Sequence, residues 1–89
     1  MSLTKAELAQ SVGLIIRDVR ISKRLTIEQL ALESGIEYSQ LSRIERGKIN
    51  TSIYHIYLIV TALKIPLRLL IKHTLIYLYK GSFNNKQSI

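Results

Sequence analysis

The sequence predicts an all-α fold of five helices joined by short turns. Apolar residues recur at helical spacing in five successive segments, and caps, glycines and a proline separate these segments. The 89 residues are 47% hydrophobic, enough for one domain with one modest core. We expect this domain to span residues 1–80 and the mostly polar residues 81–89 to form a flexible tail.

The first helix is expected from a cap at Ser2 or Thr4 to about Lys23. Its apolar residues at helical spacing are Leu8, Val12, Ile16 and Val19. Gly13 lies in the middle of this helix, where glycine costs about 1 kcal/mol relative to alanine. We therefore expect another backbone to pack closely against Gly13.

Residues 26–47 are predicted to form two short helices that meet at Gly35. Thr26 and Gln29 form a capping box, in which each side chain accepts a hydrogen bond from the other residue's backbone N–H. Gly35 can take the left-handed conformation that ends a helix and redirects the chain. Two helices at a steep angle are the geometry of a helix-turn-helix.

The second of these two helices, expected over residues 38–46, has two contrasting faces. At roughly 100° per residue, Leu41 and Ile44 point inward. The opposite face, within about 140° of arc, carries Tyr38, Ser39, Ser42, Arg43 and Arg46. Hydroxyl and guanidinium groups without a carboxylate suit the phosphates and base edges of DNA. A solvated polar face has the same pattern, so this helix alone leaves both interpretations open.

Taken together, these segments resemble the Cro/cI-type (XRE-like) family of helix-turn-helix transcriptional regulators. The resemblance covers about residues 12–70 and is carried by Arg20, Leu25-Thr26, Leu30-Ala31, Gly35-Ile36, the run LSRIERGK over residues 41–48, Ile53, Ile56 and Leu63. It implies a five-helix, lambda-repressor-like DNA-binding domain with a C-terminal extension. It also implies a homodimer that binds a palindromic operator in double-stranded DNA with the 38–46 helix in the major groove.

The resemblance further implies roles for individual residues. The residues expected to contact bases are Tyr38, Ser39, Ser42 and Arg43. Those expected to contact phosphates are Thr26, Ile27, Arg46, Lys48, Asn50 and Thr51. Arg20 and Glu45 are expected to form a structural ion pair. The chain departs from the family at Ile27, where glutamine is common, at Thr51, where proline is common, and at Glu37, a weaker helix cap than serine or threonine.

A fourth helix is expected from about Ser52 to Leu63. Its predicted inner face carries Ile53, Ile56, Ile59, Val60 and Leu63. Tyr54, Tyr57 and Leu58 are then left on the outer face, and exposed apolar patches of this kind usually contact a partner. We expect the homodimer to form through Tyr54, Tyr57, Leu58 and the 67–80 segment.

Pro66 fits the first turn of a fifth helix that starts near Ile65 and ends at Gly81. Its helical repeat is formed by Leu67, Leu70, Ile71, Thr74, Leu75 and Leu78. Residues 73–79 are also rich in β-branched and aromatic residues, so a strand paired across a dimer is the alternative. Length and periodicity favour the helix.

The net charge is +7, from 13 Lys and Arg against 6 Asp and Glu, which indicates a polyanionic partner, with nucleic acid ahead of an anionic membrane. Without cysteines the chain has neither disulfides nor thiolate zinc sites, and His55 and His73 lack metal-ligand spacing. We expect no cofactor, no metal and no enzymatic activity.

The first ten residues lack an apolar signal segment, and charges and Pro66 interrupt the tract 53–71, so we expect a cytoplasmic protein that does not enter the membrane.

Two related functions remain as alternatives at the level of sequence. An antitoxin-type protein would neutralise a partner toxin, through residues 75–83 or through Tyr54 and Tyr57, and would autoregulate its operon. A restriction–modification controller would share the fold and the chemistry and differ only in its target.

Overall fold

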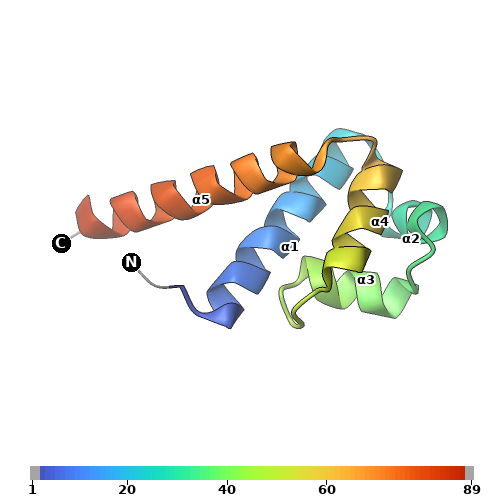
Figure 1. Cartoon of the computed structure of the whole chain (residues 1–89), viewed down its shortest axis with the longest axis horizontal. Coiled ribbons are helices and arrows are strands. Elements are labelled where there is room, and N and C mark those ends of the chain that lie inside the picture. Colours follow the sequence, from blue (N-terminus) through green and yellow to red (C-terminus); the bar gives the residue numbers. More distant parts are fainter. Residues whose placement is uncertain (1–2, 88–89) are drawn as a thin grey trace.

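The structure is a computed structural model that describes the backbone of residues 3–87 and the side chains of residues 3–80. Five helices and no strand occur in this range (Figure 1). They are α1 (Lys5–Ser22), α2 (Ile27–Ser34), α3 (Tyr38–Glu45), α4 (Ile53–Leu63) and α5 (Leu67–Gln87). The all-α prediction is confirmed.

Capping boxes start α1 and α2. In α1, Glu7 N–H donates to Thr4 Oγ1 and Thr4 N–H donates to Glu7 Oε1, both at 3.0 Å. In α2, Gln29 N–H donates to Thr26 Oγ1 at 3.0 Å and Thr26 N–H donates to Gln29 Oε1 at 2.7 Å. The predicted capping box of α2 is confirmed, and Thr4 caps α1, whereas the other expected cap, Ser2, lies outside the described residues.

Left-handed residues follow the first four helices. The backbone angle φ is +75° at Gly35 after α2 and +69° at Gly47 after α3. Arg24 after α1 and Lys64 after α4 adopt the same conformation, both with φ of +59°, although each carries a Cβ atom. This conformation lets the backbone N–H groups beyond a helix bond back to its last carbonyl groups.

The core lies among α1, α2, α3 and α4. The large side chains that are fully buried are Ile16, Leu30, Leu41, Ile44, Ile59 and Leu63. Helix α1 packs against α3, α4 and α5, and α2 packs against α3 and α4 (Figure 1). Because α3 contributes Leu41 and Ile44 to this core, its orientation is set by the body of the domain.

Three apolar residues lie elsewhere than the periodicity predicts. Ile53, expected on the inner face of α4, is 86% exposed, because it lies in the first turn of α4, beyond the edge of the core. Leu58, expected on the outer face, is half-buried and packs against the core. Leu8 of α1 is 46% exposed. Periodicity identifies the face of a helix but not where its neighbour ends, so these assignments were wrong.

Helix α5 confirms the helical prediction for residues 73–79 and excludes the strand alternative. Its first half packs along α1 through the buried Leu70 and Thr74, and its second half projects beyond the body (Figure 1). The helix does not end at Gly81 as expected but continues to Gln87, since a glycine inside a helix costs only about 1 kcal/mol. Flexibility of residues 81–89 stays a prediction.

Candidate nucleic-acid interface

The corner between α2 and α3 is built around Gly35. Its N–H donates to the carbonyl oxygen of Ala31 at 3.0 Å, which closes α2. Ile36 turns into the core, and its N–H lies 3.3 Å from the hydroxyl oxygen of the buried Ser34. Glu37 then precedes α3 without a side-chain capping bond, as expected for a weak cap. The chain therefore changes direction within two residues and presents α3 at the surface.

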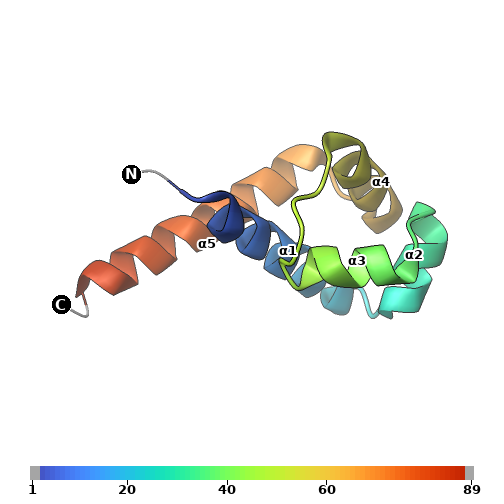
Figure 2. The same cartoon turned by 90° about the horizontal axis from the view of Figure 1, so that it is seen from below.

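Helix α3 keeps its apolar face inside and its polar face outside. Leu41 and Ile44 are 0% and 2% exposed. Tyr38 is 51% exposed, Ser39 and Arg43 are exposed, and Ser42 is half-buried. Seen from below, α3 lies across the near side of the molecule with no helix in front of it (Figure 2). The expected base-contacting residues thus lie on one accessible surface, although their contacts with DNA stay a prediction.

The ion pair implied by the family resemblance is present. Arg20 of α1 donates two hydrogen bonds to the carboxylate of Glu45, from Nε at 2.7 Å and from Nη2 at 3.0 Å. Its Nη1 also donates to the carbonyl oxygen of Leu25 at 2.7 Å. Hydrogen bonding to Glu45 raises the pKa of Arg20, so the guanidinium remains charged. Arg20 consequently joins α1, the turn before α2 and the end of α3.

Gly13 allows α1 to approach the end of α3. A Cβ atom at this position would overlap the carbonyl oxygen of Ile44 and lie 2.8 Å from that of Glu45. The expected close backbone contact is therefore confirmed. Together with the ion pair, it fixes the C-terminal end of α3 against the middle of α1.

The loop after α3 is ordered by Gly47. Gly47 N–H donates to the carbonyl oxygen of Ile44 at 3.0 Å, and Lys48 N–H donates to that of Arg43 at 2.9 Å, which is a Schellman motif. A Cβ atom on Gly47 would lie 2.6 Å from Cα of Gln10, so the loop also rests on α1. These contacts hold the loop beside the exposed face of α3.

The expected phosphate-contacting residues differ in their access to DNA. Thr26, Arg46, Lys48 and Asn50 are exposed, and Ile27 is half-buried against the core. Thr51 is half-buried, and its hydroxyl oxygen is enclosed and has no hydrogen-bond partner within the described part of the chain. The contact of Thr51 with phosphate stays a prediction, and the enclosed hydroxyl favours a contact through the backbone of Thr51.

One contact beside α3 was missed by sequence reasoning. Nε2 of Gln40 lies 3.5 Å from Nδ1 of His55, and both side chains are half-buried. Gln40 belongs to neither the apolar face nor the polar arc of α3, and His55 lies 15 residues further along the chain. Nothing in the spacing links two such residues, so the pair needs the tertiary structure to be seen.

We also searched the described residues for a metal site and for a membrane span. Residues 3–80 contain no group of three His, Cys, Asp or Glu side chains that could hold a metal ion. In the same range no single helix has both the length and the apolar composition of a membrane span, although α4 and residues 67–80 of α5 reach that composition together across a 105° bend.

A five-helix fold whose third helix, with an exposed polar face, follows a left-handed glycine corner defines the class of helix-turn-helix DNA-binding domains. The helix-turn-helix family model HTH_3 matches residues 16–70. The chain thus belongs to the XRE-type helix-turn-helix family of transcriptional regulators, as the sequence resemblance indicated. Members of this family are regulators and not enzymes.

A curated relative supports this assignment. The HTH-type transcriptional regulator SlrR of Bacillus subtilis (strain 168) is 42% identical over 57 residues. The match covers 63% of this chain and 38% of SlrR, so the chain spans well under half the length of that relative.

Solved structures of regulators share the fold. The restriction-modification controller protein C.AhdI from Aeromonas hydrophila is 37% identical with a TM-score of 0.68, over 70% of this chain and 94% of C.AhdI. The controller C.Esp1396I is 28% identical with a TM-score of 0.73, over 76% and 87% of the two chains. The clp gene regulator ClgR from Corynebacterium glutamicum has a TM-score of 0.86 over 91% of this chain and 86% of ClgR, but at 21% identity it shows the fold alone.

Proposed function

We propose that this chain is a cytoplasmic, homodimeric regulator of transcription that binds a specific palindromic site in double-stranded DNA. One observation carries the proposal: α3, which lies on the near side of the molecule in Figure 2, buries Leu41 and Ile44 and leaves Tyr38, Ser39 and Arg43 exposed. An exposed helix of this kind fits the major groove, which admits one α-helix.

Arg43 is the principal reader of bases in this proposal. Its guanidinium can donate two parallel hydrogen bonds to O6 and N7 of guanine, a contact worth about 1–3 kcal/mol of discrimination. Tyr38 and Ser39 are also exposed on α3 and are the next candidates for contacts with bases. Ser42, which is half-buried, is a further candidate. The target therefore contains a guanine opposite Arg43 in each half-site.

Phosphates are held on both sides of α3. At the start of α2, the capping box already uses the N–H of Thr26, and the N–H of Ile27 offers a donor in the positive field of the helix dipole. Beyond α3, Arg46, Lys48 and Asn50 provide exposed side chains. These contacts position the protein on the duplex and carry no sequence information of their own.

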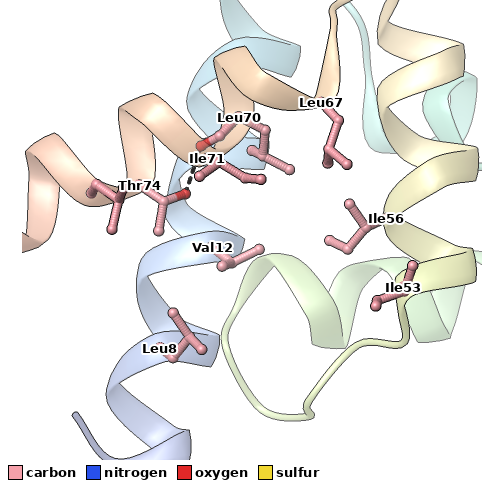
Figure 3. A pocket seen from close by; sticks show the side chains of 9 residues that line it. Leu8, Val12, Ile53, Ile56, Leu67, Leu70, Ile71 and Thr74 are labelled. Atoms are coloured by element: carbon pink, nitrogen blue, oxygen red, sulfur yellow. Dashed lines mark hydrogen bonds between the residues drawn. The ribbon is translucent and has the colours of Figure 1, made fainter. Parts of the chain in front are cut away.

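Two apolar surfaces support a homodimer. A groove of about 320 Å³ lies between α1, α4 and α5 (Figure 3), and its lining residues are Leu8, Val12, Ile53, Ile56, Leu67, Leu70, Ile71, Thr74 and Leu75. On α4 next to Ile53, the exposed rings of Tyr54 and Tyr57 stack with centroids 6.4 Å apart. Apolar surface of this extent is typical of an interface. Leu58, which we expected in the dimer surface, is half-buried, whereas the exposed Ile53 lies beside the two tyrosines. We therefore include Ile53 in the proposed dimer surface.

A two-fold dimer explains the expected palindrome. In an isologous interface the same surface of both copies is used, so the two α3 helices are related by a two-fold axis. Their half-sites would then lie about 34 Å apart, one turn of the DNA helix.

Binding experiments with labelled duplexes test the reading role of Arg43. Sites are first selected from a random duplex pool, and affinities are then measured for single-base variants. Arg43→Ala should cost about 1–3 kcal/mol on the selected site and relax the preference at one base pair. Lys48→Ala should weaken all sequences alike and lower the salt slope by about 1. Equal losses on every sequence for both variants would remove Arg43 from its reading role.

Sedimentation tests the dimer. Ile71→Glu places a carboxylate in the groove and should shift the protein to monomers and weaken binding to the two-half-site duplex. Ile21→Glu is the matched control, since Ile21 is an exposed isoleucine of α1 outside the groove lining. Identical behaviour of the two variants would contradict a role of the groove in dimerisation.

The similarity to C.AhdI favours one second candidate, a controller of a restriction–modification operon. A controller would bind DNA through the same contacts as those described above, so only its target distinguishes it. A selected site that occurs upstream of restriction and methyltransferase genes would support the controller function. The antitoxin alternative instead places a different chain on the groove or on Tyr54 and Tyr57, and copurification of a stoichiometric second small protein would support that alternative.

A further inference from the structure

Gln40 and His55 join α3 to the first turn of α4. Their side chains approach to 3.5 Å between Nε2 of Gln40 and Nδ1 of His55. The backbone N–H of His55 donates to Ser52 Oγ, the cap of α4, at 3.1 Å. The Ser52 cap therefore holds the backbone of His55, and Gln40 holds its ring.

This pair links the helix proposed to enter the major groove to the helix that follows the proposed phosphate-binding loop. Gln40 is three residues before Arg43, which places it roughly 60° around α3 from Arg43 and outside the polar arc. His55 begins the helix that follows the basic loop with the exposed Lys48 and Asn50. A donor on the His55 ring would thus adjoin both the groove-facing helix and the loop expected to hold phosphate.

The chemistry of the contact determines which ring nitrogen carries the proton. An amide Nε2 is a hydrogen-bond donor, so Nδ1 of His55 must act as the acceptor. In a neutral imidazole whose Nδ1 accepts, the proton resides on Nε2. Nε2–H is then a donor on the opposite side of the ring from Gln40, on a residue that is half-exposed.

We propose that His55 Nε2–H donates a hydrogen bond to a DNA phosphate oxygen and that Gln40 acts as its positioning residue by holding the ring in this tautomer. The inference rests on the proposed DNA binding and adds a contact from α4 to it. It differs from the contacts of Lys48 and Arg46 because the donor is uncharged. A neutral donor orients the protein on the backbone without releasing a counterion.

Nuclear magnetic resonance tests the tautomer directly. Long-range ¹H–¹⁵N spectra of the full chain at about pH 8, where imidazoles are ordinarily neutral, distinguish the protonated from the unprotonated ring nitrogen. We expect the proton of His55 on Nε2, and a shift of that resonance when the selected duplex is added. Gln40→Leu should produce a mixture of both tautomers. A wild-type proton on Nδ1, or an Nε2 resonance that the duplex does not move, would overturn the proposal.

Affinity measurements test the phosphate contact. His55→Phe retains a ring without a donor and should lower affinity about tenfold on every sequence, with no change in the salt slope. His55→Gln restores an N–H near the position of Nε2 and should recover most of the affinity. Ile21→Phe is the control, because Ile21 is an exposed residue of α1 outside the proposed DNA surface and the proposed dimer surface, and it should bind like wild type. Wild-type affinity of His55→Phe would refute the contact.

Failure of this inference is distinguishable from failure of the proposed function. If wild type binds a selected site and Arg43→Ala relaxes its sequence preference while His55→Phe binds like wild type, the His55 contact alone is wrong. If wild type retards no duplex at low salt, both proposals fail. Circular dichroism of each variant confirms that the helices are retained, and the wild-type tautomer measurement does not depend on any variant.

Discussion

Arg20 and Glu45, 25 residues apart in the sequence, form a two-pronged ion pair with N–O distances of 2.7 and 3.0 Å. Only 12% of the Arg20 side chain and 4% of the Glu45 side chain are exposed. The pair connects α1 to the last residue of α3, two residues after Arg43 and three after Ser42. It thereby fixes the angle at which the exposed face of α3 leaves the body.

Breaking this pair from one side should strongly destabilise the domain. Glu45→Gln leaves a buried guanidinium without its counter-charge, and we expect a loss of about 3–5 kcal/mol in the free energy of unfolding in urea. Because the folded pKa of Arg20 is raised above its ordinary, already strongly basic value, its contribution is complete at all pH values below that ordinary value and is lost only as pH rises through the folded pKa. The loss should therefore be constant between about pH 6 and 9. Arg17→Met, at an exposed arginine of α1, is the control, and an equal loss there would contradict the prediction.

Gly13→Ala should also destabilise the domain, although alanine is the better helix former. The added methyl group would overlap the backbone carbonyl of Ile44, and neither backbone can move without disturbing the core. Overpacking of this kind costs about 1–3 kcal/mol, measured by urea unfolding. Gly35→Ala provides the comparison, since no atom lies within 4 Å of its Cβ position and its cost arises from the left-handed backbone alone. A Gly13→Ala protein more stable than wild type would show that α1 and α3 do not meet here.

Lys64→Gly should stabilise the domain. Lys64 ends α4 with φ of +59°, a conformation that a Cβ atom disfavours, and its side chain is exposed. Removing the Cβ should contribute about 0.5–1 kcal/mol, or a rise of several degrees in Tm. Lys64→Ala keeps the Cβ and should show no such rise. If both variants melt at the same temperature, the strain at this position is absent.

The cap of α1 should weaken in acid. The backbone N–H of Thr4 donates to the carboxylate of Glu7 and lowers its pKa below the ordinary value of 4.5, with a smaller effect from the Thr4 hydroxyl. A lowered folded pKa contributes stability that is present above 4.5 and is lost as pH falls through the folded pKa. The stability difference between wild type and Glu7→Gln should therefore shrink as pH falls below 4.5, in thermal melts at successive pH values. A stability difference between wild type and Glu7→Gln that grows as pH falls would contradict this prediction.

Much of the fold could be predicted from local patterns. The capping box of Thr26 and Gln29, the left-handed Gly35, and the inward face of Leu41 and Ile44 all follow from interactions within a few residues of each other. Such short-range signals are independent of the rest of the chain, and the structure confirms each of them. The ion pair of Arg20 and Glu45 was implied by family resemblance, not by any local pattern.

Other features depended on where one helix stops against another. Ile53 continues the apolar repeat of α4 but lies past the edge of the core, while Leu58 interrupts the repeat and is packed. Thr51 has the residue type of a phosphate contact, yet its hydroxyl is enclosed. Burial at these positions is decided by the ends and crossing of neighbouring helices, which periodicity does not contain.

The sequence by itself determined that this chain is all-α, where its first four helices begin and end, and which face of α3 is polar, because hydrogen bonding of caps and the 3.6-residue repeat act over one or two turns. The tertiary structure alone decided that Gln40 meets His55, that the hydroxyl oxygen of Thr51 is enclosed, and that an apolar groove opens between α1, α4 and α5. These features arise where residues distant in sequence meet, and such meetings are set by how the helices pack together.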